Sequence, residues 1–469
     1  MDERPRELGY APVGRLLWHF SWPAIVGMTC NALYNVVDRA FVGHGVGPLA
    51  IAATTVAFPV MIILMALSVL VGVGTTALIS IRLGEQKKEE AELAAANGTA
   101  LLFLLPLSFA VVYFLFPEPI LRLFGATDEV MPYARDFMDI IMLGAPFGSL
   151  GMGMNNFIRA EGNPLMAMST QVFGALLNGI LNYVFIFHLK MGIKGSALAT
   201  VTGQVFASLW VLSYYFTGRS LVKLKLKNFA LRLPVILNIT AIGFAPFAMQ
   251  MANSLQQVIL NKTVLRYSGD LGLSAVGIMM SIAGLLLMPI LGISQGAQPI
   301  IGFNYGARQY SRVIDALKKA VIAASCVSVT GYLALRLWPS QIAALFTEGE
   351  PELIDTTAQA MRTFFAMIFV IGFQVICSNY FQAVGKAKQA AVLSLSRQVL
   401  LFIPLLLILP HFWGIKGVWR TPPIADALSS AITACFILRE VKLLSAKKQL
   451  AGTQMATVQL NPSRHLNRY

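Results

Sequence analysis

Long apolar runs alternate with short polar connections along almost the whole chain. The runs cover residues 18–42, 49–80, 94–116, 133–157, 165–187, 195–216, 236–264, 273–301, 316–338, 356–381, 390–409 and 418–438. A helix needs about 20 apolar residues to cross a bilayer, and it satisfies its own backbone hydrogen bonds where no water is present. The pattern therefore predicts an all-α integral membrane protein with twelve transmembrane helices.

Composition agrees with this pattern. Hydrophobic residues make up 56% of the chain and charged residues only 12%, whereas soluble domains carry roughly 25% charged residues. The four cysteines, Cys30, Cys326, Cys377 and Cys435, lie singly inside the apolar runs and form no CxxC spacing. We expect them to be core residues and neither disulfides nor metal ligands.

The net charge of +14 follows the predicted topology. Basic residues gather in alternate connections, chiefly those that contain Lys88, Lys225, Arg308 and Lys386. Basic loops stay on the cytoplasmic side, so we expect both termini in the cytoplasm of a bacterium, with the chain crossing the inner membrane many times. Anionic lipid head groups account for the basic excess, and we expect no nucleic-acid partner.

The sequence repeats itself at a nearly constant offset. PEPILRLF from Pro117 matches PSQIAALF from Pro339, and MGIKG ending at Gly195 matches WGIKG ending at Gly417, both 222 residues apart. GTTALISIRLG also matches GAQPIIGFNYG at this offset, and FIRAEG matches FQAVG one residue further on. Four matches in one order predict two homologous halves. Because each half has six spans, the halves enter the membrane from the same side as a parallel repeat.

This repeat predicts the domain organisation. We expect an N-terminal lobe at residues 1–217, a basic amphipathic linker on the inner membrane surface at 218–234, a C-terminal lobe at 235–440 and a cytoplasmic tail at 441–469. Two six-helix lobes around a central site suit alternating access, in which one lobe moves against the other. Such a pair of lobes encloses its own cleft, so we expect a monomer.

An acidic residue interrupts the first apolar run, in the stretch NALYNVVDRAFVGHG. On a helix, Asp38 shares one face with Asn31, Tyr34 and Asn35, because residues three, four and seven apart lie on the same side. An ionisable side chain inside the membrane costs several kcal/mol, and its usual explanation is a functional site. We therefore expect a polar face that points into the protein.

Two further spans carry polar residues at helical spacing. Asn178 and Asn182 lie four apart in the fifth run, and Thr200 and Gln204 lie four apart in the sixth. Asp38, the two asparagines and Thr200 form an oxygen-rich set of the type that hard cations such as Na⁺ prefer. Each alone is also explained by hydrogen bonding between helices. The positions 222 residues beyond Asp38, Asn178 and Asn182 are Leu260, Leu400 and Pro404, which confines the set to the first lobe.

The second half has polar residues of its own. Asn253, Gln256, Gln295 and Arg397 are candidates for lining a substrate cleft, although hydrogen bonds between helices explain them equally well. The first half adds four further cleft candidates, Asn31, Tyr34, Asn35 and Gln204. Asp139 and Asp426 are further acids inside predicted spans.

The sequence resembles the multidrug and toxic compound extrusion (MATE) family and, within it, the MepA-like bacterial branch. NALYNVVDRAFVGHG, GTTALISIRLGEQKKEEAE, MLGAPFGSLGMGMNNFIRAEGNP and GIKGSALATV carry the resemblance. It implies a secondary transporter without a cofactor that exports amphipathic, mostly cationic compounds in exchange for Na⁺ or H⁺. The family's cation-binding aspartate falls on Asp38, its asparagines on Asn178 and Asn182, and its threonine on Thr200.

One departure from the family bears on the coupling ion. Many relatives carry a second aspartate where this chain has Asn182, followed by proline where it has Tyr183. A single carboxylate binds one proton or one Na⁺ at a time, and the residue types leave that choice open. Two rival functions fit less well. A flippase for a lipid-linked precursor needs several cations in its cleft, and an intramembrane enzyme needs a motif such as HExxH, which the sequence lacks.

Overall fold

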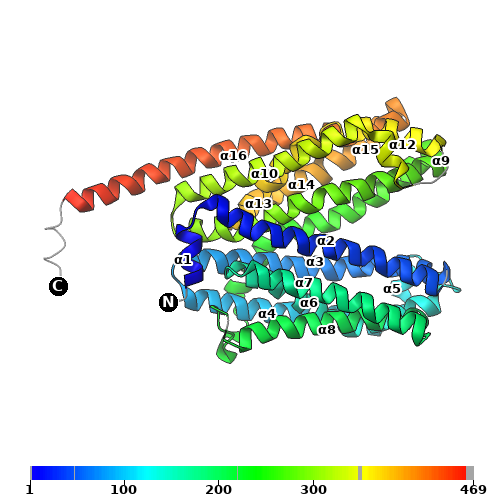
Figure 1. The fold of residues 1–469 in the computed structure, drawn as a ribbon, viewed down its shortest axis with the longest axis horizontal. Helices are drawn as coiled ribbons and strands as arrows, with labels where there is room; N and C mark the ends of the chain where they lie inside the picture. The colour runs from blue at the N-terminus through cyan, green and yellow to red at the C-terminus, as the bar shows by residue number, and fades with distance from the viewer. Residues whose placement is uncertain (1–2, 47, 219, 347–350, 461–469) are drawn as a thin grey trace.

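The structure is a computed structural model that describes residues 3–46, 48–218, 220–346 and 351–460. Within these ranges the structure does not describe the side chains of residues 3–6, 31, 32, 34–37, 39, 40, 43–45, 48, 49, 51, 52, 270 and 450–460. All regular secondary structure in the described ranges is helical. Figure 1 shows these helices as a long bundle.

The first half of the chain forms a set of helices joined by short turns. They are α1 (Glu3–Tyr10), α2 (Val13–Gly45), α3 (Pro48–Gly84), α4 (Lys88–Leu115), α5 (Pro117–Leu123), α6 (Met131–Ala160), α7 (Pro164–Tyr183), the π-helix η1 (Val184–His188) and α8 (Gly192–Phe216). The turn before α7 ends on Asn163, whose side chain accepts a hydrogen bond from the backbone N–H of Met166. Pro164 follows at the first helical position, where its missing N–H has no cost.

The second half follows the same plan. It contains η2 (Leu226–Phe229), α9 (Leu233–Gly306), α10 (Tyr310–Leu337), α11 (Pro339–Ala344), α12 (Pro351–Phe364), η3 (Ile368–Val370), α13 (Ile371–Ala383), α14 (Ala387–Leu395), the π-helix η4 (Ser396–Phe402), α15 (Ile403–Trp413) and α16 (Ile415–Leu460). Gly269, with φ of 59°, breaks α9 into two spans. The twelve predicted apolar runs all fall on helices.

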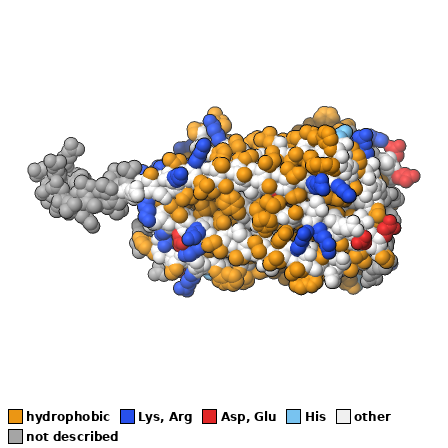
Figure 2. Space-filling model, turned by 90° about the horizontal axis from the view of Figure 1, so that it is seen from above, with side chains coloured by type: hydrophobic (Ala, Val, Ile, Leu, Met, Phe, Trp, Pro, Cys, Tyr) orange, Lys and Arg blue, Asp and Glu red, His pale blue; other side chains and the backbone are white. Residues whose placement is uncertain are grey.

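Nine described helices are long and apolar enough to cross a membrane, and a tenth span is the pair Pro351–Phe364 and Ile368–Ala383, bent by 51°. Large apolar side chains on these helices point outward; Leu176, Ile180 and Leu285 are each more than 60% exposed. Figure 2 shows hydrophobic side chains dominating one face of the molecule between groups of Lys and Arg. Such a surface is stable in lipid.

The internal repeat is visible in the backbone. Residues with positive φ recur 222 or 223 positions apart, as the pairs Gln86 and Arg308, Gly162 and Gly385, and Gly192 and Gly414. Each pair occupies the same turn in the two halves. Two of the buried apolar clusters draw almost all their residues from 42–222, and the third draws most of its residues from 245–444. In Figure 1 the corresponding helices form a lower and an upper group.

The two groups of helices touch most closely at the end that carries the N-terminus. There α3 of the lower group runs against α9 of the upper one, and the first half of α2 runs beside the last third of α9. Glycines permit this approach. A Cβ added to Gly74 would lie 2.0 Å from the carbonyl oxygen of Ile239, and one added to Gly243 would lie 1.7 Å from that of Leu70. Toward the opposite end of Figure 1 the two groups diverge.

The connection between the halves is fastened to the first half. Asn97 on α4 accepts a hydrogen bond from the backbone N–H of Arg232 at 2.9 Å and donates to two carbonyl oxygens of the connection. Glu92 forms a 2.5 Å ion pair with Lys225. Buried Glu161 accepts from Ser220 and from the backbone N–H of Leu221. The described part of the segment contains one short 3₁₀ helix, η2, and its Lys223, Lys225 and Lys227 side chains are exposed.

Candidate functional site

Asp38 lies at the centre of a polar network inside the first half. Its Oδ1 accepts a hydrogen bond from Nδ2 of Asn182 at 2.8 Å and one from the hydroxyl of Ser196 at 3.2 Å. Asn182 and Ser196 are fully buried. Three helices, α2, α7 and α8, thus converge on one carboxylate. We call this group, extended by Asn178 and Thr200, the Asp38 network.

The network continues along α7. Nδ2 of Asn182 also donates to Oδ1 of Asn178 at 2.8 Å, and Nδ2 of Asn178 donates to the hydroxyl of Thr200 at 3.3 Å. The Oδ1 atom of Asn182 is buried and has no hydrogen-bond partner. A buried acceptor without a donor is costly, and a cation or a protonated group would relieve that cost. The four residues expected from the sequence therefore lie in one connected group.

Local backbone geometry brings Ser196 to Asp38. The π-helix η1 begins at Val184, two residues after Asn182, and such widened turns are frequent at functional sites. Gly195 lies against η1, where a Cβ would come within 3.1 Å of the Phe185 carbonyl oxygen. The first turn of α8 can therefore approach α7 closely. Sequence reasoning missed Ser196, although its spacing of four from Thr200 places both on one helical face.

A cavity of about 290 Å³ opens beside the network, which we call the first-lobe cavity. Its lining combines methionines, small residues and amides, and Asn178 and Thr200 belong to both the cavity wall and the network. Gln204 faces it with a buried Oε1 that has no partner. Flexible, polarisable methionines suit ligands of varied shape. The cavity wall also contains Gly174, Ala175 and Ala207.

The other predicted cleft residues have separate places. The side chains of Asn31, Tyr34 and Asn35 lie outside the described part of the structure. Gln295 on α9 accepts a hydrogen bond from Arg159 on α6, which links the two halves. Arg159 is 3% exposed, and its role as a partner of Gln295 was not expected from the sequence. Gln256 has a buried Oε1 without a partner.

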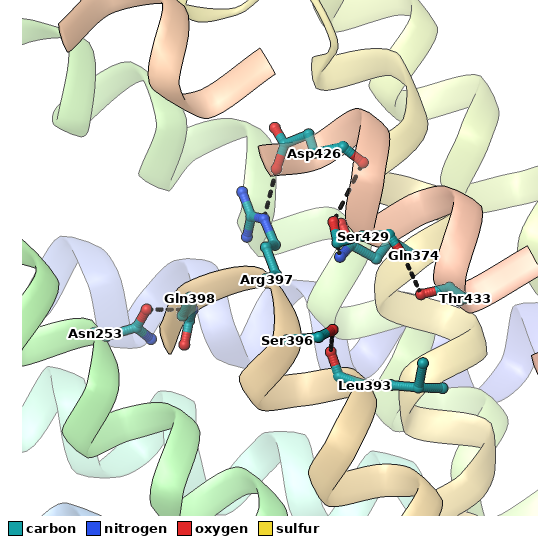
Figure 3. A network of polar contacts seen from close by, with 9 residues as sticks. All are labelled: Asn253, Gln374, Leu393, Ser396, Arg397, Gln398, Asp426, Ser429 and Thr433. Atoms are coloured by element: carbon teal, nitrogen blue, oxygen red, sulfur yellow. Dashed lines mark hydrogen bonds and ion pairs between the residues drawn. The ribbon is translucent and has the colours of Figure 1, made fainter. Parts of the chain in front are cut away.

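A second polar network crosses the other half and is drawn in Figure 3. Nε of Arg397 lies 2.6 Å from Oδ1 of Asp426. The neighbouring Gln398 donates to Asn253, and Gln374 donates to Ser429 at 2.7 Å. The sequence indicated Arg397 and Asp426 as separate intramembrane groups, and the structure joins them as an ion pair between η4 and α16. Asn253 and Arg397 are thus both engaged with protein partners.

Asp139, the remaining intramembrane acid, lies apart from both networks. It accepts a hydrogen bond from Tyr113 at 2.9 Å, and its side chain is 38% exposed. Among the described residues no group of three or more His, Cys, Asp or Glu side chains could hold a metal ion.

Comparison with known proteins places these features in context. The model of the MatE family matches residues 23–184 and 246–408, once in each half. The multidrug export protein MepA of Staphylococcus aureus (strain N315) is 24% identical over 453 residues, which cover 96% of this chain and 100% of that protein.

Solved structures of MATE transporters have the same fold as this chain. The MATE multidrug transporter DinF-BH in complex with R6G superposes with a TM-score of 0.86 and 38% sequence identity, covering 94% of this chain and 98% of that one. The outward-facing conformation of a multidrug resistance MATE family transporter of the MOP superfamily superposes with a TM-score of 0.88 at 25% identity, covering 95% and 99% of the two chains.

Proposed function

Because the chain belongs to the MATE family of multidrug efflux transporters, we propose that it is an antiporter that exports amphipathic cations in exchange for Na⁺ or H⁺. It is a bacterial-type multi-pass membrane protein that transports small molecules and is not an enzyme. The expected all-α membrane fold is confirmed by the match to MATE transporter structures and by nine described helices, or ten with the bent pair, that are long and apolar enough to cross a membrane. The exchange mechanism, the coupling ion and the residues that bind it are our proposals.

The Asp38 network is the observation that carries the proposal. It combines one carboxylate with four hydroxyl or amide side chains, two of which donate to the carboxylate, and it contains one buried amide oxygen that lacks a donor. A Na⁺ ion would take the oxygens of Asp38, Asn178, Asn182 and Thr200 as ligands, because hard cations prefer oxygen. A proton would instead neutralise Asp38 alone, since amides and hydroxyls do not titrate in this range.

The shared wall between network and cavity supports coupling. Asn178 and Thr200 line the first-lobe cavity and also belong to the Asp38 network. An exported cation in this cavity would lie close to the carboxylate, so the two positive charges would compete for it. Such competition makes binding of one ion unfavourable to binding of the other, which is the requirement for exchange.

The contact between the lobes supports alternating access. The close contacts at glycines of α3 and α9 lie at the end that carries the N-terminus, which we assign to the cytoplasmic side. We therefore propose that this conformation is outward-facing and that the protein acts as a monomer in the inner membrane. The opposite state requires these helices to separate while the divergent ends approach each other.

The experiment is dye efflux from proteoliposomes with an imposed Na⁺ gradient or an imposed proton gradient. Asp38→Asn keeps the size of the side chain and removes its charge, so export should stop while the protein remains folded. Asn182→Asp places a second carboxylate beside the first, and two close like charges favour retention of a proton. Export by this variant should become more dependent on the proton gradient.

A matched control is Asn155→Asp, which changes an amide in the wall of the cavity outside the Asp38 network. It should not change the ion preference. Export by Asp38→Asn at the wild-type rate, or an Asn182→Asp variant with unchanged ion preference, would contradict the proposed coupling site.

A further inference from the structure

The internal repeat assigns a first-lobe counterpart to each partner of the Arg397–Asp426 ion pair. At the offset of 222 set by the GIKG motifs, Asp426 corresponds to Gln204 and Ser429 to Ala207. Arg397 corresponds to Ala175 at this offset and to Gly174 at the offset of 223 found at the preceding turn. All four first-lobe counterparts line the first-lobe cavity.

The supporting helices correspond as well. In the first lobe the cavity lies between α7 and α8, among other helices, and these two pack together. In the second lobe η4 packs against α16, the helix that begins at the second GIKG motif. The Arg397 side chain crosses from η4 to Asp426 on α16 (Figure 3). The first lobe thus has a small residue beside its cavity, and at the corresponding place the second lobe has the guanidinium of Arg397.

We infer that the second lobe contains a cation-binding site for guanidinium-type or ammonium ligands, and that Arg397 is its built-in occupant. Asp426 is the anionic part of this site, and its side chain is only 5% exposed. Ser429, beside it, donates to the carbonyl oxygen of Asp426 and accepts from Gln374. Because Arg397 neutralises Asp426 internally, the second lobe takes up neither a coupling ion nor a substrate cation.

This assignment has a consequence for coupling, which rests on the proposed antiport function. With Asp426 held by Arg397, ion exchange in the proposed mechanism takes place at Asp38 in the first lobe. A buried carboxylate that loses its partner binds another cation or a proton, because an unpaired charge in a low-dielectric interior is unfavourable. Shortening Arg397 would therefore open a second exchange site and raise the number of coupling ions per exported molecule.

The binding experiment uses the purified full chain in detergent. Arg397→Ala introduces the small residue found at the counterpart position Ala175. Added methylguanidinium chloride at low millimolar concentration should raise the melting temperature of this variant, because a ligand that binds only the folded state stabilises it. Wild type should show no such shift, and neither should Arg397→Ala in the presence of urea, an uncharged molecule of similar shape.

Two further variants keep the test decisive. Arg397→Ala combined with Asp426→Asn removes both charges, so it should fold without rescue by methylguanidinium. Arg397→Lys retains a built-in cation and should also lack rescue. If Arg397→Ala is too unstable to purify, addition of methylguanidinium during extraction should recover it, whereas the double variant should need none. An Arg397→Ala protein that melts at the same temperature with and without methylguanidinium would overturn the inference.

A transport measurement completes the test. The number of Na⁺ or H⁺ ions exchanged per dye molecule should rise by about one in Arg397→Ala and return to the wild-type value in the double variant. Rescue by methylguanidinium without any ion-driven export in wild type would retain the second-lobe site and refute the antiport function. An unchanged ion ratio in an active Arg397→Ala variant would refute the consequence for coupling.

Discussion

A single methyl group at Gly243 is expected to shift the protein away from the conformation described above. In Gly243→Ala the new Cβ would lie 1.7 Å from the carbonyl oxygen of Leu70 and 2.7 Å from its carbonyl carbon. Both atoms belong to the backbone of α3, so no side-chain rotation can relieve the contact. Ordinary van der Waals contact begins at 3.4 Å. The two helices would have to separate by roughly 1.5 Å to reach ordinary contact distances.

The magnitude follows from the cost of overpacking, typically 1 to 3 kcal/mol. If the substitution destabilises only the state in which the lobes touch, by about 2 kcal/mol, the ratio of the two states changes by about thirtyfold. The variant should therefore populate the state in which the two lobes are apart at the end of the bundle that carries the N-terminus. Gly277→Ala and Gly284→Ala are matched controls on the second span of α9, because a Cβ at either position meets no atom within 4 Å.

The assay is a pulsed EPR distance distribution between spin labels at Lys88→Cys and Arg308→Cys, in a background without the four native cysteines. Both side chains are exposed. Lys88 lies in the first lobe and Arg308 in the second, at the end of the bundle that carries the N-terminus. Gly243→Ala should add a longer distance that the Gly277→Ala and Gly284→Ala controls lack. A distribution identical to wild type in a folded Gly243→Ala protein would refute the idea that the glycine contact seals this end.

Two further predictions concern the Asp38 network and the connection between the lobes. Ser196→Ala removes a donor that stabilises the free carboxylate of Asp38, and because hydrogen bonds to charged groups contribute about 1.5 kcal/mol or more, the apparent affinity for the coupling ion should rise about tenfold. Ser208→Ala, which removes a buried hydroxyl bonded only to its own helix, should leave that affinity unchanged, and equal values for the two variants would contradict the role of Ser196. Burial raises the pKa of Glu161 to about 7 from 4.5, against the lowering effect of its bonds to Ser220 and Leu221. The folded protein then binds a proton that the unfolded chain releases, so this stabilisation is complete below pH 4.5 and is lost as the pH rises through 7, by about 3 kcal/mol at most. Thermal unfolding of Glu161→Gln should therefore depend less on pH between 5 and 8 than that of wild type, and parallel profiles would contradict the assignment.

The sequence predicted the helices well because the membrane imposes a strong one-dimensional constraint. Apolar length identifies spans without knowledge of their neighbours, and a repeat offset read from four short motifs reappears in the positive φ values of Gln86 and Arg308. Helical spacing grouped Asn178 with Asn182 for the same reason. These predictions need only the geometry of one helix.

Contacts between helices that are distant in the sequence could not be predicted from the sequence. Arg397 and Asp426 lie 29 residues apart on different helices, and the π-helix that aims Arg397 at Asp426 has no clear sequence signature. The pairing of Arg159 with Gln295 spans 136 residues and both lobes. The basic pattern of the connection predicted a membrane-surface segment, but it gave no indication of the contacts with Asn97, Glu92 and Glu161 that attach the connection to the first lobe. Such partners depend on tertiary packing.

The attachment of the connection to the first lobe gives the molecule a lever. The start of α9 is held by the first lobe, because the backbone N–H of Arg232 is bonded to Asn97 and Ile239 packs in the first-lobe core. The first span of α9, Leu233–Gly269, has 37 residues and is therefore about 55 Å long at 1.5 Å per residue. A rotation of about 10° around its fixed end displaces the far end by roughly 10 Å. A small backbone change near the start of α9 would therefore open or close the end of the bundle opposite the N-terminus.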